Sequence, residues 1–380
     1  MKKKTKIIAA LDSFKGAASS YEAGCAVKRG ITERLPDCEV TVFPLGDGGE
    51  GTSAAFADLG IVRSVTVSDT HRDKTEAHYV LFERNGKRVG VFDMAEVSGL
   101  GLSRKHGLDI ATATTAGVGE LIVHLKTLGC DEIIVGLGGS GTNDGGIGAL
   151  ARLGVRLYDK NGAELDGTLG AVVLSSIASC DLSPARTILD GITLTLLYDA
   201  DVMLTGESGA TDMFSRQKGA SDADVVRLEG AMRSFAEVGD RAVGYTASSA
   251  SGCGAAGGLG YGLSLVGGTL RSGAEYVLDL VGFREAVADA DLVITGEGKT
   301  DRQTARGKLP LTVARYAGDV PTVCLCGTFE FDRVLFENGF DAVISIVDSP
   351  MTLEASMKST LSLLEKSAYS IAGLYSAIVK

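Results

Sequence analysis

Acidic residues, hydroxyls and lysines recur beside glycine in four short segments of this 380-residue chain. The segments are 45–52 (LGDGGEGT), 136–148 (GLGGSGTNDGGIG), 252–262 (GCGAAGGLGYG) and 296–308 (GEGKTDRQTARGK). Glycine leaves backbone N–H groups uncovered, so an anionic phosphate can approach them. Carboxylates can hold Mg²⁺ or accept a proton, and lysines can neutralise phosphate oxygens. The four segments therefore indicate phosphoryl-transfer chemistry.

The acidic and basic side chains in and near these segments can be sorted by the work that a kinase requires. Phosphoryl transfer needs a metal ion, cations around the phosphates and a carboxylate near the attacking hydroxyl. Residue types alone do not separate a proton acceptor from a metal ligand, because both tasks ask for a carboxylate. The candidate carboxylates are Asp12, Asp47, Glu50, Asp144, Glu297 and Asp301, and the candidate lysines are Lys15, Lys218, Lys299 and Lys308.

Each of these features also has a structural interpretation that needs no ligand. Loops of glycine and acid are often tight turns and helix caps, and Asp12 with Ser13 could cap a helix. Lys218, in a Gln-Lys-Gly sequence, could be a solvated surface lysine. The joint recurrence of acid, hydroxyl, lysine and glycine favours the functional interpretation.

A dinucleotide site is an alternative that the sequence raises. The pattern G-x-G-x-x-G begins at Gly46, Gly136 and Gly252, and the second copy follows a predicted strand. Asp159 stands about where an acid would bind the ribose. Two observations oppose this interpretation: Asp144 would lie where the pyrophosphate needs room, and Asp159 belongs to a hairpin sequence. No Walker A sequence is present either.

Composition excludes several classes of protein. The net charge is −11, from 48 acids and 37 bases, which disfavours nucleic acid as a partner. No run of 18 apolar residues is present, so no membrane span is expected. The seven cysteines are scattered without a C-x-x-C pair and the four histidines show no metal-ligand spacing, which opposes a disulfide framework or a zinc site. The protein is expected to be cytoplasmic.

The elements that must position these residues alternate between strand and helix at both ends of the chain. The N-terminal pattern predicts a strand at 6–10, a helix at 20–35 and a strand at 39–43. The C-terminal third repeats the alternation, which predicts a parallel sheet. Because ligands bind beyond the carboxyl ends of parallel strands, glycine segments that follow strands are well placed for binding. The expected C-terminal elements are strands at 291–295, 321–325 and 341–347, and helices at 309–317, 332–338 and 353–378.

The middle of the chain has a different pattern of predicted elements. Antiparallel strands are expected at 62–67, 78–82 and 88–94, with an Asn-Gly turn at 85–86. We therefore predict an α/β fold in which a mixed α/β domain is inserted into an open parallel-sheet, Rossmann- or flavodoxin-like domain. The first domain would comprise 1–60 and 285–380, and the inserted domain 61–284. Within the inserted domain we also expect helices at 115–128 and 223–238, a strand at 132–137 and a hairpin around 160–162.

Taken in order, these segments resemble the bacterial glycerate kinase type-1 family. Six motifs of the family have a similar segment in this chain. They are A-P-D-S-F-K (residues 10–15), D-G-G-E-G-T (47–52), G-I-G-G-S-A-T-N-D-G-G (136–146), Q-K-G-A (217–220), G-A-A-G-G-L-G (254–260) and T-G-E-G-x-x-D-x-Q-T-x-x-G-K-x-P (295–310). Leu11, Leu137 and Gly141 depart from the family pattern. The segment 198–206 departs further, because it lacks the family's Asn-Pro pair.

The resemblance implies ATP- and Mg²⁺-dependent phosphorylation of D-glycerate, giving 2-phosphoglycerate or 3-phosphoglycerate, in a cleft between two α/β domains. D-Glycerate and ATP are the expected partners, and a homodimer is left open. Lys15, Asp144 and Asp301 are the candidate catalytic residues, with Asp144 and Asp301 also the candidate Mg²⁺ ligands. The candidate substrate- and phosphate-binding residues are Asp12, Ser13, Asp47, Gly48, Gly49, Glu50, Ser140, Thr142, Asn143, Lys218, Gly296, Glu297, Gly298 and Lys308.

Two other functions are kept beside this one. A paralogue that binds a sugar acid or nucleotide without turnover would fit the altered segment 198–206. An NAD-dependent oxidoreductase would fit the glycine pattern from Gly136 together with Asp159. Stabilisation by NADH alone would favour the oxidoreductase, whereas binding of both kinase ligands without release of ADP would favour the paralogue.

Overall fold

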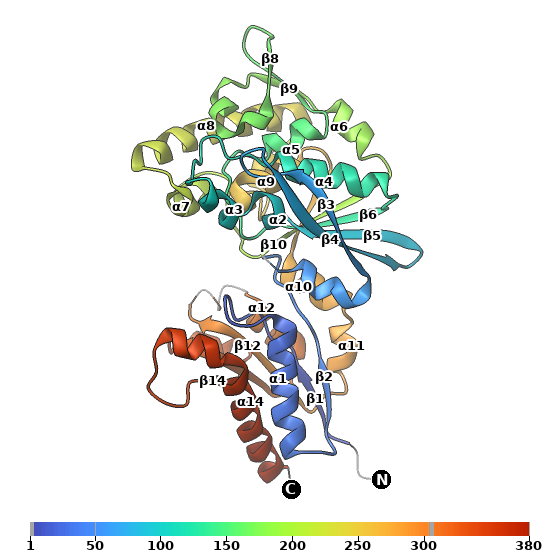
Figure 1. Ribbon diagram of the computed structural model, residues 1–380, viewed down its shortest axis with the longest axis vertical. Coiled ribbons are helices and arrows are strands. Elements are labelled where there is room, and N and C mark those ends of the chain that lie inside the picture. The colour runs from blue at the N-terminus through green and yellow to red at the C-terminus, as the bar shows by residue number, and fades with distance from the viewer. Residues whose placement is uncertain (1–3, 50, 303, 305–307, 380) are drawn as a thin grey trace. The chain divides into compact units, whose positions relative to one another are not determined.

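The computed structural model describes residues 4–49, 51–302, 304 and 308–379, and it divides into two compact units (Figure 1). Unit 1 consists of Met1–Asp47 and Ala274–Lys380, and unit 2 of Gly48–Gly273. Where the functional domains begin and end stays a prediction. In the described part of the chain, no helix is both long and apolar enough to cross a bilayer.

Unit 1 is built on a five-stranded parallel sheet with the order β14-β13-β12-β1-β2. Numbered within this sheet, the strand order is 5-4-3-1-2, which is the flavodoxin-like order. The order reverses between β1 and β12, and ligands bind at such a switch point in open α/β sheets. The strands are β1 (Lys6–Ala9), β2 (Glu39–Val42), β12 (Leu292–Thr300), β13 (Thr322–Phe329) and β14 (Ala342–Ser345). The predicted open parallel sheet is confirmed.

Two long helices cover one face of this sheet and lie side by side in Figure 1. Helix α1 (Ser20–Arg34) begins with a capping box formed by Ser19 and Glu22. A Cβ atom on Gly30 would lie 2.1 Å from the Glu365 carbonyl oxygen, so glycine permits the close approach of α14 (Leu353–Ile378). The other helices in the described part of this unit are α10 (Gly273–Leu280), α11 (Phe283–Val287), α12 (Leu309–Ala317) and α13 (Arg333–Glu337), of which α12 and α13 pack on the opposite face of the sheet.

Unit 2 contains a six-stranded mixed sheet with the order β11-β10-β6-β5-β4-β3. The first four strands are parallel, whereas β3, β4 and β5 form an antiparallel meander. Asn85 and Gly86 both have positive φ, of 53° and 73°, as the predicted hairpin turn requires. The strands are β3 (Ile61–Ser68), β4 (Lys74–Arg84), β5 (Lys87–Asp93), β6 (Glu132–Gly136), β10 (Thr193–Tyr198) and β11 (Thr269–Ser272). Strands β10 and β11 were not predicted.

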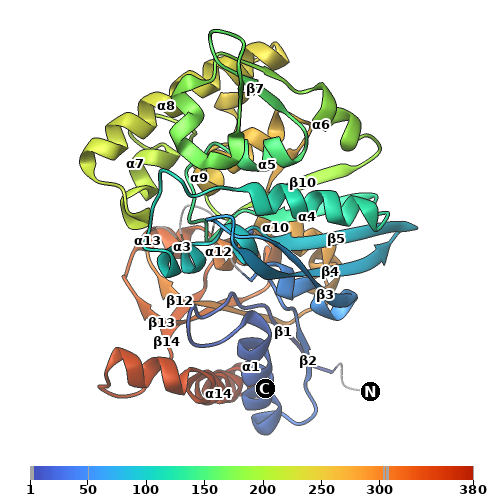
Figure 2. The same cartoon turned by 45° about the horizontal axis from the view of Figure 1, so that its top comes forward.

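Helices and a small second sheet complete unit 2 (Figure 2). The small sheet has the order β8-β7-β9 and contains the predicted hairpin around 160–162. Its strands are β7 (Arg156–Tyr158), β8 (Glu164–Leu165) and β9 (Ser179–Asp181). The helices are α2 (Ala95–Ser98), α3 (Leu100–Lys105), α4 (Ala116–Thr127), α5 (Ile147–Arg152), α6 (Ser183–Ile188), α7 (Ala210–Phe214), α8 (Asp222–Val243) and α9 (Ala255–Ser264), with short 3₁₀ helices η1 (Ser53–Leu59), η2 (Gly167–Ser176), η3 (Arg216–Lys218) and η4 (Ala247–Ser249).

Candidate active site

Three predicted carboxylates gather at the carboxyl ends of neighbouring strands in unit 1. Asp12 follows β1, Asp47 follows β2 and Glu297 lies in β12. Asp12 is 8% exposed, and its backbone N–H donates to the Gly296 carbonyl oxygen at 2.8 Å. Burial raises the pKa of Asp12 well above its usual range, and the negative charges of Asp47 and Glu297 raise it further. The switch point of the sheet therefore concentrates negative charge that a cation would stabilise.

Glu297 lies between a hydroxyl and an ammonium group. The Thr304 hydroxyl donates to Glu297 Oε1 at 2.6 Å, and Lys308 Nζ lies 3.9 Å from Glu297 Oε2. Burial raises the pKa of Glu297, whereas these two neighbours lower it. Lys308 occupies the N-cap position of α12. The predicted acids and lysines of this segment are thus brought together by one strand and the start of one helix.

The segment after β1 runs beside β12 without capping a helix. Ser19, not Asp12, caps α1, so the interpretation of Asp12 and Ser13 as a helix cap is wrong. The Ser13 N–H instead donates to Asp12 Oδ1 at 2.6 Å. A Cβ atom on Gly298 would lie 3.9 Å from the backbone nitrogen of Lys15, which places Lys15 next to β12.

Glycines 296 and 298 lie inside β12, whereas the sequence placed them in a loop beyond a shorter strand. A Cβ atom on Gly296 would lie 2.1 Å from the Leu325 carbonyl oxygen of β13. Strand packing therefore accounts for Gly296 without a phosphate. Asp301 follows the strand directly, and its carboxylate lies 3.0 Å from Lys299 Nζ. The candidate Glu50 lies outside the described residues.

In unit 2, a buried carboxylate that sequence reasoning missed joins two glycine segments. Asp93 ends β5 and accepts hydrogen bonds from the backbone N–H groups of Gly51 and Ser53. The N–H of Gly138 donates to the carbonyl oxygen of Gly48 at 2.9 Å. Gly48 and Gly49 are buried. Some of the glycine N–H groups expected to face a phosphate are therefore bound to the protein itself.

Asp144 is likewise occupied by the protein. Its carboxylate is fully buried and accepts hydrogen bonds from the Thr115 N–H and hydroxyl, at 2.9 and 2.8 Å. The N–H groups of Gly146 and Gly148, at the start of α5, donate to it at 3.0 and 3.3 Å. Burial raises its pKa, and these donors oppose the rise. These four hydrogen bonds anchor the loop that follows β6, and the role of Asp144 as a metal ligand stays a prediction.

Lys218 is 2% exposed, so its interpretation as a solvated surface lysine is wrong. Its ammonium donates to the Ser140 hydroxyl at 2.8 Å and to the Thr142 carbonyl oxygen at 2.7 Å. Burial lowers the pKa of Lys218 to about 7, while the negative charge of Asp144 opposes that change. The ammonium thus fixes the segment that follows β6.

Several polar atoms around Lys218 are buried without a hydrogen-bond partner among the described residues. They are Thr142 Oγ1, Asn143 Oδ1 and Ser215 Oγ. Asn143 Nδ2 does donate to the Thr211 hydroxyl at 3.1 Å. Because a buried polar atom without a partner is costly, such atoms indicate an unfilled hydrogen-bonding requirement. A polar ligand or water could meet it.

The third glycine segment forms a left-handed turn against the same loop. Ala256, Gly257 and Gly258 have φ values of 56°, 64° and 88°. A Cβ atom on Gly257 would lie 2.1 Å from the Thr142 carbonyl oxygen. Ala256 holds a backbone conformation that residues other than glycine, asparagine and aspartate seldom adopt, and such strain often marks functional sites.

The features expected of a dinucleotide site do not assemble. Asp159 lies in the turn between β7 and β8, where its Oδ1 accepts the N–H groups of Asn161 and Ala163, both at 2.8 Å. Asp159 therefore closes its own hairpin, as the sequence suggested, and does not follow a strand of the large sheet.

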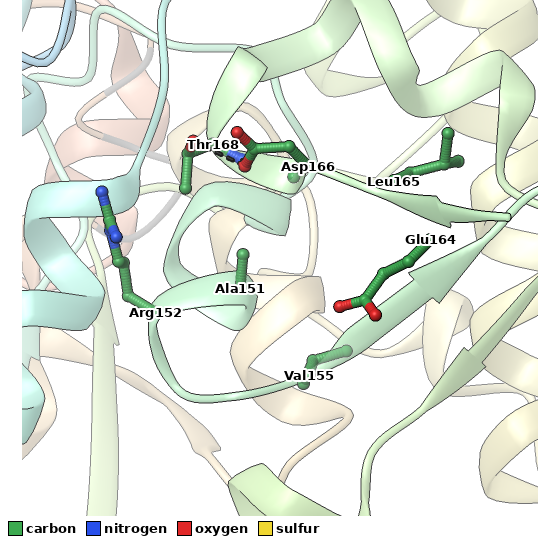
Figure 3. Close-up of a pocket in the computed structure, with 8 residues that line it drawn as sticks. Ala151, Arg152, Val155, Glu164, Leu165, Asp166 and Thr168 are labelled. Atoms are coloured by element: carbon green, nitrogen blue, oxygen red, sulfur yellow. Dashed lines mark hydrogen bonds between the residues drawn. The ribbon is translucent and has the colours of Figure 1, made fainter.

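A cavity of about 330 Å³ in unit 2 lies apart from the predicted residues (Figure 3). The Asp166 carboxylate at its wall accepts the N–H and hydroxyl of Thr168 and caps η2. Arg152 Nε lies 3.1 Å from Glu120 Oε1. None of the predicted site residues that the structure describes lines this cavity, which is bounded by Ala151, Arg152, Val155, Glu164, Leu165, Asp166, Gly167 and Thr168.

Unit 1 has a flavodoxin-like sheet with acids and lysines at its switch point, and unit 2 is a second α/β unit with glycine-rich loops. This combination of fold and site is the one expected of a kinase that acts on a small molecule. Comparison with known proteins gives the particular family. The model of the glycerate kinase family matches residues 7–376, and the chain belongs to that family. It is therefore related to phosphotransferases that act on an alcohol group.

The relatives cover almost the whole chain. The glycerate kinase of Bacillus subtilis is 38% identical over 373 residues, which is 97% of each chain. The glycerate 2-kinase of Escherichia coli K12 is 36% identical over 359 residues, or 93% of each chain. A crystal structure from Salmonella typhimurium LT2, provisionally assigned as glycerate kinase 2, has a TM-score of 0.85 at 35% identity and covers 99% of both chains.

Proposed function

We propose that the protein transfers the γ-phosphoryl group of ATP to a hydroxyl of D-glycerate, giving 2-phosphoglycerate and ADP. The names of the relatives support the substrate, and the Escherichia coli name supports the 2-position. The observation that carries the proposal is the gathering of Asp12, Asp47 and Glu297 at the switch point of the unit 1 sheet. Phosphoryl transfer requires a cation at the phosphates, and this edge would attract one.

The unit 1 carboxylates fit a Mg²⁺ site better than Asp144 does. Mg²⁺ is usually held by one or two carboxylates together with the substrate's phosphates. Burial raises the pKa of Asp12, the charges of Asp47 and Glu297 raise it further, and a bound cation would relieve the repulsion among these carboxylates. Asp12 and Asp47 would hold the ion, which supplies positive charge to the β- and γ-phosphates when bound. Asp301 stays a proposed ligand or proton acceptor.

The chain's own residues then have distinct tasks. Lys15 and Lys308 are proposed to neutralise phosphate oxygens, since both lie beside β12. The Thr142 hydroxyl is proposed to donate to the carboxylate of glycerate and Asn143 Oδ1 to accept a glycerate hydroxyl, because each of these buried oxygens has no partner in the described part of the protein. Lys218 would hold their loop in place and contribute positive charge.

The test is product identification after incubation with D-glycerate, ATP and Mg²⁺. Proton and phosphorus NMR should show 2-phosphoglycerate and an equal amount of ADP. Formation of 3-phosphoglycerate would overturn the position of attack but not the reaction. Melting-temperature shifts with both ligands but no ADP would identify a paralogue without turnover, and a shift with NADH alone would contradict the kinase.

A further inference from the structure

Asp93 lies beneath two glycine segments that come from distant parts of the chain. It is the last residue of β5, and it pairs in register with Gly136, the last residue of the parallel strand β6. Asp93 is 3% exposed. No feature of the sequence marks it, because it stands alone between apolar residues.

The Asp93 carboxylate organises the first glycine loop, defined here as residues 48–53 apart from 50. Oδ2 accepts the Gly51 N–H at 3.0 Å and the Ser53 hydroxyl at 2.8 Å, and Oδ1 accepts the Ser53 N–H at 3.1 Å. The same loop is joined to the segment after β6 by the bond from the Gly138 N–H to the Gly48 carbonyl oxygen. Asp93 therefore sets where both segments lie.

The glycine at 136 is explained by this carboxylate. A Cβ atom there would lie 2.5 Å from Asp93 Oδ1, so any larger residue would displace the side chain. The Met94 N–H donates to the Gly136 carbonyl oxygen at 2.8 Å, which holds the two strand ends together. Gly136 thus makes room for an internal anion.

The hydrogen-bonding pattern favours the ionised form of Asp93. Three donors point at its two oxygens, and a proton on either oxygen would remove an acceptor. Burial raises the pKa of Asp93 to about 7, the bonds from Ser53 and Gly51 oppose the rise, and the like charge of Glu96 in α2 adds to it. Proton uptake in the neutral range would therefore loosen the loop.

We propose that Asp93 is a positioning residue of phosphoryl transfer, which holds the first glycine loop against the segment after β6 in the arrangement that binds substrate. The inference rests on the proposed function, since the loop's task is taken from it. Asp93 touches no substrate in this proposal and acts through Gly51 and Ser53.

Two variants test the proposal in the full-length protein. Asp93→Asn should lower kcat roughly a hundredfold, because small misplacements of binding groups have effects of that size. Asp131→Asn is the matched control: Asp131 accepts the Arg88 N–H at the amino end of β6, and its loss should leave kcat unchanged. Circular dichroism and melting temperature establish that both variants are folded.

The pH profile of Ser53→Ala separates a positioning role of Asp93 from a merely structural one, because a structural role would leave that profile unchanged. Loss of the Ser53 hydroxyl removes a bond that lowers the Asp93 pKa. The acid limb of the pH profile of kcat/KM should therefore move to higher pH in Ser53→Ala, and in Asp93→Asn it should lose the contribution of Asp93 and keep that of Asp12. An unmoved acid limb, or wild-type kcat in a folded Asp93→Asn, would overturn the proposal.

Failure of the proposed function is separately visible in the wild type. If wild-type protein forms no phosphoglycerate, the role of Asp93 is tested by measuring the affinity for ATP–Mg²⁺ with calorimetric titration. Asp93→Asn should then weaken that affinity at least tenfold relative to Asp131→Asn, and equal affinities would refute the positioning role.

Discussion

Two buried aspartates change how the glycine-rich loops of this protein should be understood. Asp93 accepts the N–H groups of Gly51 and Ser53, and Asp144 accepts those of Gly146 and Gly148. A carboxylate at the start of a helix is stabilised by the same N–H groups that could bind a phosphate. Part of the glycine content therefore serves internal anions that fix the loops, rather than the phosphates of a ligand.

Asp12→Asn should raise stability while lowering activity. The raised pKa means that the folded state binds a proton more tightly than the unfolded state, so the stability due to Asp12 is present at low pH and lost as pH rises through its folded pKa. Asparagine carries no charge, and the variant should melt about 2 °C or more above wild type at pH 8. Its kcat/KM should fall at least about a hundredfold.

The control for this prediction is Asp37→Asn, because Asp37 is an exposed acid before β2. Calorimetry and a coupled ADP assay supply the two measurements. Mg²⁺ alone should raise the melting temperature of wild type and of Asp37→Asn, but not that of Asp12→Asn. An equal Mg²⁺ effect in all three proteins would remove Asp12 from the metal site.

Lys218→Met tests the buried ammonium through pH. The pKa of Lys218 falls from the usual value near 10.5 to about 7, so between these values the unfolded chain binds more protons and stability increases with pH. Each pKa unit corresponds to about 1.4 kcal/mol, so wild type should gain roughly 2–3 kcal/mol relative to Lys218→Met from pH 7 to pH 9.5. Urea unfolding at both pH values measures the free energy of unfolding of each protein. A difference between wild type and Lys218→Met that does not change with pH would contradict the assigned pKa.

At the scale of elements, the sequence predicted those features of helices and turns that depend on residues close together in the chain. The turn at Asn85 and Gly86 depends on two adjacent residues, and the sequence predicted it. The capping box of Ser19 and Glu22, seen in the structure, is a similarly local feature. The burial of Lys218 was not predicted, because its acceptors on Ser140 and Thr142 lie 78 and 76 residues away in the chain. The donors to Asp93 are likewise 40 and 42 residues away. Strand β12 extends past its predicted end because Lys299 and Thr300 continue to pair with β13.

The left-handed turn within α9 permits a comparison of two neighbouring alanines. Ala256→Gly should stabilise the protein by about 1 kcal/mol, because glycine adopts positive φ without steric strain. Ala255→Gly should instead destabilise it by about 0.5–1 kcal/mol, because both methyl groups are buried but Ala255 is not among the residues with left-handed dihedral angles and gains no relief of strain. Urea unfolding of the two variants should show opposite signs. Destabilisation by both would mean that Ala256 is not strained.

At the scale of the whole molecule, the chain leaves unit 1 after Asp47 and returns to it at Ala274. Each unit has a hydrophobic core of its own: one in unit 2 between its mixed sheet and helices such as α4, α5 and α8, and others on the two faces of the unit 1 sheet. A continuous segment with its own core can fold alone. Unit 2 is such a segment, whereas unit 1 is divided between the two ends of the chain.

The separate core of unit 2 leads to a prediction for the fragment 48–273. This fragment should fold cooperatively, with a single urea transition, because it retains its own core and both internal aspartates, Asp93 and Asp144. It should form no phosphoglycerate and show no Mg²⁺-dependent rise in melting temperature, because Asp12, Asp47 and Glu297 belong to unit 1. The intact chain, measured alongside, should show both. Stabilisation of the fragment by Mg²⁺ alone would place the metal site in unit 2 and return Asp144 to consideration, whereas a fragment without a cooperative transition would show that unit 2 depends on unit 1 for its fold.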